Sequence, residues 1–177
     1  MSKIRVYSEP SGSVKVVTFV ADDPASIAAE HNRILAQGQI DPAAVFAEYA
    51  DVSQAPTPTP TGFGSLLRNA FRLKGGKITL DLPTAQAIKL NQIRAQRVAL
   101  FTAADAAYNI AVDTGNTVTA AAISAYRQQL RNLPQAAQPQ LAALTDPVAI
   151  EMYQVVLPTP PPAVSAIPVS PAGVAQP

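Results

Sequence analysis

The chain has 177 residues, enough for one ordinary domain or two small ones, but its 17 prolines argue against a single compact unit. A net charge of +1, with Lys and Arg mixed among Asp and Glu, gives no basic stripe of the kind that nucleic-acid binding needs. Because the chain has no cysteine and a single histidine, His31, it offers neither disulfides nor a thiolate or histidine metal cluster.

The start of the chain predicts a small folded unit over residues 1–52. Residues 4–7 and 14–20 are rich in β-branched side chains and flank a Glu-Pro-Ser-Gly-Ser segment, which indicates a β-hairpin. Asp23 before a proline then predicts a helix start, since Asp can cap a helix and proline suits its first position. His31 falls on the apolar stripe of this helix, where we expect it to have a structural or surface role and not to be a ligand.

A second helix start is predicted at Asp41-Pro42, with a short helix over residues 43–49. The N-terminal unit is thus expected to have the order ββαα. About fifty residues bury little core, so we expect this unit to need a partner surface or oligomerisation for stability.

Residues 53–62 have low complexity, with proline and threonine alternating. Alternating prolines favour an extended polyproline II conformation, so we expect a semi-rigid spacer between the two parts of the chain. After it, the Gly75-Gly76 pair between the apolar runs 63–73 and 78–82 predicts a β-hairpin. Ile78 stands where a phosphate-binding loop requires Ser or Thr, so no nucleotide site is expected there.

The region 63–134 continues into two predicted antiparallel helices that meet at Asp113-Thr114-Gly115-Asn116. Thr84 is the expected cap of the first helix, and Pro134 is expected to end the second. Apolar side chains recur at the 3.6-residue period on one face of each helix. These positions are Leu90, Ile93, Leu100, Phe101, Ala104, Tyr108 and Val112, then Val118, Ala122, Ile123, Tyr126, Leu130 and Leu133.

Counting outward from the turn places Asp105 opposite a residue near Ala125 to Arg127, so the geometry allows an Asp105–Arg127 ion pair across the helical hairpin. Such a pair would align the helices and contribute at most about 1 kcal/mol where solvent reaches it. The alternative is that Arg94, Arg97, Arg127 and Arg131 form one cluster that recognises an acidic partner. The sequence leaves both readings open.

The last part of the chain has weak signals. Residues 135–156 contain one short helix or strand, with Asp146-Pro147 as a start signal. Residues 157–177 are rich in proline and carry no charge, so they cannot build a core alone and are expected to be disordered or extended when free. If this tail is ordered, we expect it to lie along another subunit.

The segments Ile93-Arg94-Ala-Gln-Arg97 and Tyr126-Arg127-Gln-Gln-Leu130-Arg131-Asn-Leu-Pro134, with Asp105 between them, resemble the helical hairpin of tail assembly and tail-fibre assembly proteins of tailed bacteriophages. In that family an IRxxR segment precedes a helix with an Asp and a YRxxLRDxP signature. This chain departs from the pattern at Ala106, where the family commonly has Trp, and at Asn132, where it commonly has Asp.

The sequence as a whole predicts an α+β protein: a ββαα unit, a proline-rich linker, a β-hairpin leading into a helical hairpin, and an extended tail. No pattern of catalytic, cofactor-binding or metal-binding residues is found, so we expect no enzyme. The candidate partner-binding or hairpin-core residues are Ile93, Arg94, Arg97, Leu100, Asp105, Tyr126, Arg127, Leu130 and Arg131.

The resemblance implies a protein made in the host cytoplasm that acts in the virion tail. Its partners would be fibre or baseplate subunits within an oligomeric assembly. The balanced charge argues against a nucleic-acid partner, and no apolar run approaches the ~20 residues that span a bilayer, so we expect no membrane partner. Two roles follow from the resemblance: a structural component that links these subunits, or a transient assembly chaperone that is absent from the mature particle. A proline-rich interaction module built on residues 53–62 is a further alternative.

Overall fold

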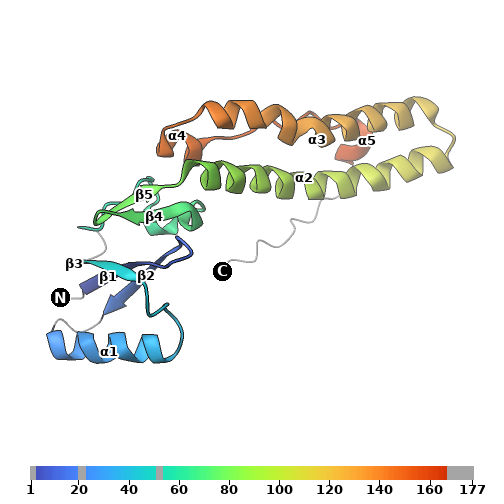
Figure 1. Ribbon diagram of the computed structural model, residues 1–177. Helices are drawn as coiled ribbons and strands as arrows, with labels where there is room; N and C mark the ends of the chain where they lie inside the picture. Colours follow the sequence, from blue (N-terminus) through green and yellow to red (C-terminus); the bar gives the residue numbers. More distant parts are fainter. Residues whose placement is uncertain (1–2, 20–22, 51–53, 167–177) are drawn as a thin grey trace. The chain divides into compact units, whose positions relative to one another are not determined.

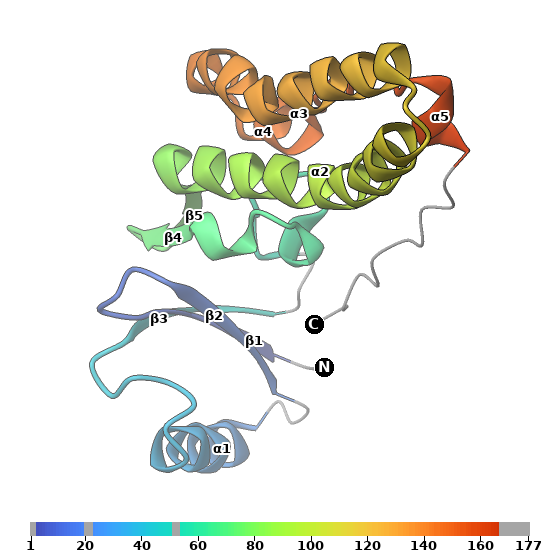
Figure 2. The same cartoon turned by 90° about the vertical axis from the view of Figure 1, so that its right-hand side faces the viewer.

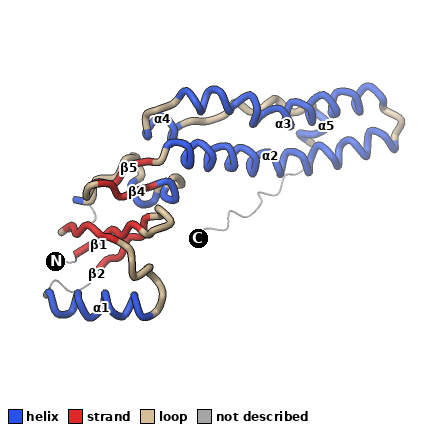
Figure 3. Tube along the Cα trace, in the orientation of Figure 1, coloured by secondary structure: helices blue, strands red, loops and turns tan. Residues whose placement is uncertain are grey.

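The computed structural model describes residues 3–19, 23–50 and 54–166. The chain forms two compact units (Figure 1). The first unit contains residues 1–88 and 145–152, and the second contains residues 89–144 and 153–177. The fold is α+β, with an antiparallel sheet and one helix, a β-hairpin, and then a long helical hairpin (Figure 3).

The first unit is built on a three-stranded antiparallel sheet in the order β2-β1-β3. The strands are β1 (Lys3–Ser8), β2 (Val14–Phe19) and β3 (Val45–Tyr49). The predicted hairpin of β1 and β2 is confirmed, with Val6 opposite Val16. Its turn includes Gly12 at φ +85°, a left-handed conformation that glycine adopts without a steric penalty.

Helix α1 (Pro24–Ala36) packs on one face of this sheet. The predicted start is confirmed, because the Asp23 carboxylate accepts a hydrogen bond of 2.8 Å from the Ser26 N–H. Ile34 of the helix, Tyr7 of β1 and Ile40 after the helix form the buried cluster on this side. The alternation of side chains along β1 sends Ile4 and Val6 to the opposite face.

The predicted helix over residues 43–49 is wrong, since this segment forms strand β3. Asp41 accepts a hydrogen bond of 2.7 Å from the Ala43 N–H, so the supposed cap closes a turn instead. The five residues Val-Phe-Ala-Glu-Tyr then pair antiparallel with β1, with Ala47 opposite Val6. The order of the N-terminal unit is therefore ββαβ, because strand pairing outweighs a local helix signal.

The second face of the sheet is covered by the β-hairpin of β4 (Phe71–Lys74) and β5 (Lys77–Leu80). Two short 3-10 turns, η2 (Gly62–Gly64) and η3 (Arg68–Ala70), precede it. Gly75 and Gly76 both have positive φ in the turn, as the Gly-Gly pair predicted. The shared core comprises Ile4, Val6, Ala55, Phe71 and Ile78.

The proline-rich segment before β4 is packed into this unit where the structure describes it, from Gln54 onward. Ala55 and Thr59 are buried, and Ala55 belongs to the same core as Ile4 and Phe71. Thr61 donates a hydrogen bond from its hydroxyl to Glu151 of the short helix α4 (Pro147–Met152). A semi-rigid spacer was expected here, but the small side chains of Ala55 and Thr59 are buried and anchor the segment to this unit.

The helical hairpin consists of α2 (Leu82–Asp113) and α3 (Thr117–Ala143). Thr84 was predicted to cap α2, but Asp81 occupies the position just before the helix. Its carboxylate accepts a hydrogen bond of 2.9 Å from the Thr84 hydroxyl. The predicted end of α3 at Pro134 is wrong, because the helix continues through Pro134 and Pro139.

Residues 153–166 return along the second unit and include the short helix α5 (Pro162–Ser165), which lies beside the hairpin in Figure 2. Figures 1 and 3 show the same extended course between α4 and α5. The tail up to Ala166 therefore packs on the helices of its own chain, whereas we expected an ordered tail to need another subunit. The prediction for residues 167–177 lies outside the described residues.

Candidate functional site

The turn of the helical hairpin is formed by the residues that predicted it. Gly115 has φ +69°, and the Asn116 side chain accepts a hydrogen bond of 3.0 Å from the Thr119 N–H at the start of α3. The turn allows the two helices to pack along their length. Their main cluster consists of Ala103, Ala104, Ala107, Ala111, Ile123, Tyr126 and Leu130, with Val164 from the tail.

Four candidate residues of the hairpin lie in or beside its core. Ile93, Tyr126 and Leu130 are buried, and Leu100 is half-buried against the main cluster. The Tyr126 hydroxyl is itself buried and has no hydrogen-bond partner within the described residues. Burial raises the pKa of this phenol above its ordinary value. These side chains hold the helices together and are not available to a partner in this conformation.

The predicted ion pair between the helices is present in the structure. Arg127 Nη2 lies 2.8 Å from Asp105 Oδ1, and the guanidinium carbon lies 5.0 Å from the centre of the Tyr108 ring. The Asp105 side chain is 51% exposed, so solvent screens the pair and we expect it to contribute at most about 1 kcal/mol. The pair joins α2 to α3 at the solvent-facing side of their contact.

Arg97 explains how α3 passes through Pro134. Proline has no N–H, so the Leu130 carbonyl four residues earlier loses its helical donor. Arg97 Nη1 donates hydrogen bonds of 3.1 Å to both the Leu130 and the Arg131 carbonyl oxygens. A side chain of α2 thus replaces the hydrogen bond that proline removes, and the helix continues where the sequence predicted its end.

The other two arginines of the proposed cluster remain at the surface. Arg94 donates to the Asn91 side chain at 2.7 Å, and Arg131 donates to the Gln128 side chain at 3.3 Å, both within their own helix. Arg97 and Arg127 are engaged between the helices. The four arginines therefore do not form one free basic site, and an acidic partner would meet at most Arg94 and Arg131.

The C-terminal tail covers part of the hairpin, a feature that the sequence analysis missed. Tyr153 and Val155 pack beside the Ile93 and Leu133 cluster, and Val164 enters the main cluster with only 3% of its surface exposed. The Tyr153 hydroxyl donates a hydrogen bond of 2.9 Å to the Gln140 side chain. We call residues 153–166 the strap. The apolar dipeptide Ala163-Val164 among prolines was the only local signal for it.

Four aliphatic side chains of the hairpin point away from its core and are more than half exposed. They are Val98, Ile110, Val112 and Val118. Val118 lies in the first turn of α3, and Ile110 and Val112 lie in the last turn of α2, so three of the four surround the turn of the hairpin. The prediction that Val112 and Val118 lie on the packed faces of their helices is wrong, because both side chains are exposed. An exposed group of this kind, with few charges nearby, is typical of a surface that contacts another protein.

His31 in the first unit has the structural role that was expected. Its Nδ1 lies 2.7 Å from the Tyr7 hydroxyl, and the two rings stack with their centres 5.7 Å apart. Burial, with a further contribution from the nearby Arg5, lowers the pKa of His31. The Phe46 ring packs against both aromatic rings, so the imidazole joins α1 to the sheet.

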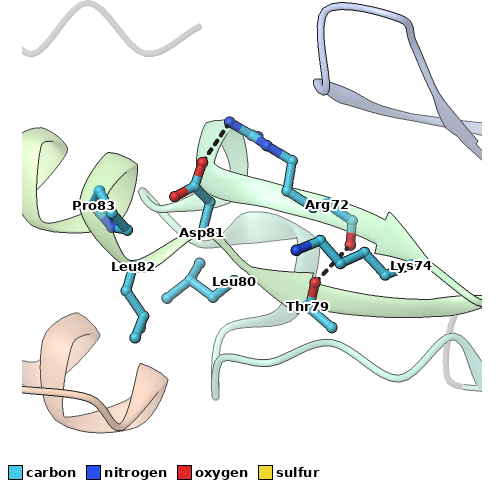
Figure 4. A pocket seen from close by; sticks show the side chains of 7 residues that line it. All are labelled: Arg72, Lys74, Thr79, Leu80, Asp81, Leu82 and Pro83. Carbon is cyan, nitrogen blue, oxygen red and sulfur yellow. Dashed lines mark hydrogen bonds and ion pairs between the residues drawn. The ribbon is translucent and has the colours of Figure 1, made fainter.

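A cleft of about 420 Å³ lies at the end of the β4–β5 hairpin, lined in part by Lys74, Thr79 and Asp81 (Figure 4). Asp81 is already bound, because Arg72 Nη2 lies 3.1 Å from its carboxylate. The Thr79 hydroxyl donates to the Arg72 carbonyl oxygen at 3.3 Å. Arg72 thus engages both Thr79 and Asp81 of this lining.

A search of the described residues finds no group of three or more His, Asp or Glu side chains that could hold a metal ion. Within the same residues no helix is both long enough and apolar enough to cross a bilayer. Comparison with models of protein families, with curated proteins and with solved structures finds no significant match to this chain.

Proposed function

We propose that this chain is a non-enzymatic component of a bacteriophage tail that links baseplate or tail-fibre subunits in the virion. The observation that carries the proposal is the helical hairpin, whose turn exposes Ile110, Val112 and Val118 while its interior is closed by its own contacts. The resemblance of the IRxxR and YRxxLR segments supplies the context of a phage tail.

The polar side chains of the first unit support a non-enzymatic role, because they bind one another. His31 is bonded to Tyr7, and Asp81 is bonded to Arg72 and Thr84. Glu48 accepts hydrogen bonds of 2.9 Å from Lys3 and Arg5, and these bonds lower its pKa. Side chains that catalysis would employ are thus committed to the packing of the first unit.

A transient tail-fibre chaperone is the second candidate, and the strap favours it. An ordered tail does not require another subunit, because residues 153–166 pack on the hairpin of the same chain. A strap of this kind can protect an apolar surface until a fibre subunit replaces it. The third alternative, a proline-rich ligand in residues 53–62, gains no support from the burial of Ala55 and Thr59.

Mass spectrometry of purified particles, compared with the lysate that produced them, tests the proposal. A fixed copy number per particle supports a structural component. Abundance in the lysate with absence from particles supports the chaperone. Presence in neither fraction of a productive infection would contradict both.

A double substitution at the turn of the hairpin tests whether this surface binds the partner. Replacing Ile110 and Val118 with Asp changes only exposed side chains, so the helices should remain folded while incorporation into particles or fibre binding is lost. Gln128→Glu adds a charge to an exposed position of α3 and serves as the control that should leave incorporation unchanged. Normal incorporation of the double Asp variant would refute the hairpin turn as the partner surface.

A further inference from the structure

Strand β3 forms an edge of the N-terminal sheet that lacks the usual protection. In the order β2-β1-β3 it pairs with β1 on one side, and no described strand pairs with its other side. Its sequence, Val-Phe-Ala-Glu-Tyr, has high β propensity and contains neither proline nor lysine. Val45 is 65% exposed and Phe46 is 45% exposed. An uncovered edge with apolar side chains is a template for another strand.

The opposite edge of the same sheet, strand β2, is protected against the addition of another strand. Lys15 of β2 is exposed, lies 2.7 Å from the Glu9 carboxylate and donates a hydrogen bond of 2.6 Å to the Gln39 carbonyl oxygen. A lysine and a neighbouring loop are common means of preventing strand addition. Glu48, the one charged residue of β3, is neutralised within the chain by Lys3 and Arg5.

We propose that β3 pairs antiparallel with β3 of a second copy of this chain, forming a continuous six-stranded sheet across a two-fold axis. The two-fold axis must be perpendicular to the sheet. Each residue then lies opposite a residue of the second copy whose side chain is on the same face of the sheet. With Ala47 opposite its own copy, Val45 faces Tyr49 of the second copy and Phe46 faces Glu48 of the second copy. No like charges oppose each other in this register.

This register also gives the exposed side chains suitable neighbours. Val45 opposite Tyr49 is an aromatic and β-branched pair, which is a favourable combination across strands. On the other face, the Arg5 guanidinium carbon lies 4.4 Å from the centre of the Phe46 ring and Arg5 Nε lies 2.9 Å from Glu48. In the paired sheet, Glu48 of the second copy lies opposite Phe46, so aromatic ring, guanidinium and carboxylate alternate across the two-fold axis. The inference does not rest on the proposed function.

Sedimentation of the full chain over a range of concentrations tests the pairing. We expect a reversible monomer–dimer equilibrium that Val45→Lys weakens by about tenfold or more, because a charge at the edge opposes strand addition. Val156→Lys is the matched control, since it introduces the same charge at an exposed valine of the second unit and should leave the dimer unchanged. A chain that remains monomeric at all concentrations would overturn the proposal.

Cysteine substitution tests the register, because the natural chain has no cysteine. In this pairing, positions 47 of the two copies have Cα atoms about 4.5–5.5 Å apart, which a disulfide can bridge. Positions 45 lie about 13 Å apart, four residues along the strand, which is too far. Oxidation should therefore link Ala47→Cys dimers and leave Val45→Cys unlinked. Equal linking of both variants, or linking of Val45→Cys alone, would refute the register.

Discussion

A buried tyrosine lies in each of the two units, and the two differ in whether the hydroxyl group is hydrogen-bonded. Tyr7 and Tyr126 are both buried, but the Tyr7 hydroxyl is 2.7 Å from His31 Nδ1 whereas the Tyr126 hydroxyl has no partner in the described part of the chain. Tyr7→Phe should cost about 1–3 kcal/mol in the free energy of unfolding, since it leaves the imidazole nitrogen unpaired. Tyr126→Phe should be neutral or stabilising, because a buried unpaired hydroxyl is removed.

Urea unfolding of the two variants measures this difference, with circular dichroism following the helices and amide hydrogen exchange following the first unit. The two substitutions remove the same atom from equally buried rings, so each is the other's control. A loss of stability in Tyr126→Phe equal to that in Tyr7→Phe would mean that the Tyr126 hydroxyl is hydrogen-bonded in solution.

Arg97 and Pro134 depend on each other. If Arg97 supplies the hydrogen bond that Pro134 cannot, Arg97→Leu should destabilise the hairpin by about 1–3 kcal/mol in the natural chain. In the Pro134→Ala background the backbone N–H returns, so the same substitution should cost clearly less. Urea midpoints of the four chains give the coupling energy. Arg94→Leu, which loses only a surface bond to Asn91, is the control, and equal costs of Arg97→Leu in both backgrounds would contradict the account.

Within the strap, two valines differ strongly in burial. Val164 is buried in the main cluster of the hairpin, whereas Val156 of the same strap is 88% exposed. Val164→Asp should lower the free energy of unfolding of the hairpin by about 2–3 kcal/mol, because an apolar contact is replaced by a charge. Val156→Asp introduces the same residue without losing a contact and should change little.

Thermal and urea unfolding followed by circular dichroism, together with protease cleavage of the strap, measure the effect. We expect Val164→Asp to retain its helices in water but to be cleaved faster within residues 153–166. Equal behaviour of the two Asp variants would show that the strap does not stay on the hairpin in solution.

The elements that the sequence predicted well are those whose signals are local. The helical period of α2 and α3, and Gly115 with Asn116 between them, lie within one continuous stretch, and counting from that turn located the Asp105–Arg127 pair. The β1–β2 hairpin and the Asp23 cap are local signals of the same kind.

The elements that were wrong or missed depend on distant partners. Asp41-Pro42 suits a turn as well as a helix start, and only pairing with β1 makes β3 a strand. Pro134 ends a helix by local rules, but Arg97 of the other helix provides the missing donor. Val164 has no periodic signal at all, because its place is formed by two helices that precede it by many residues.

At the scale of the whole molecule, the hydrophobic clusters follow the division into two units. The clusters around Phe71 and around Ile34 consist of residues from the first unit. The clusters around Leu130 and around Leu141 consist of residues from the second unit. A cavity in one of these cores should therefore lower the stability of that unit first, since cooperative opening follows the residues that share a core.

Ile34→Ala and Leu130→Ala test this in the full chain, because each removes a buried aliphatic side chain from one unit and should cost about 2–5 kcal/mol there. Hydrogen exchange followed by mass spectrometry should show Ile34→Ala reducing protection in β1 and α1, with the amides of α3 retained. Leu130→Ala should show the reverse. A uniform loss of protection in either variant would mean that the chain unfolds as a single cooperative body. A hairpin that opens independently can exchange its strap for a partner while the N-terminal sheet remains folded, which is the behaviour that the chaperone alternative requires.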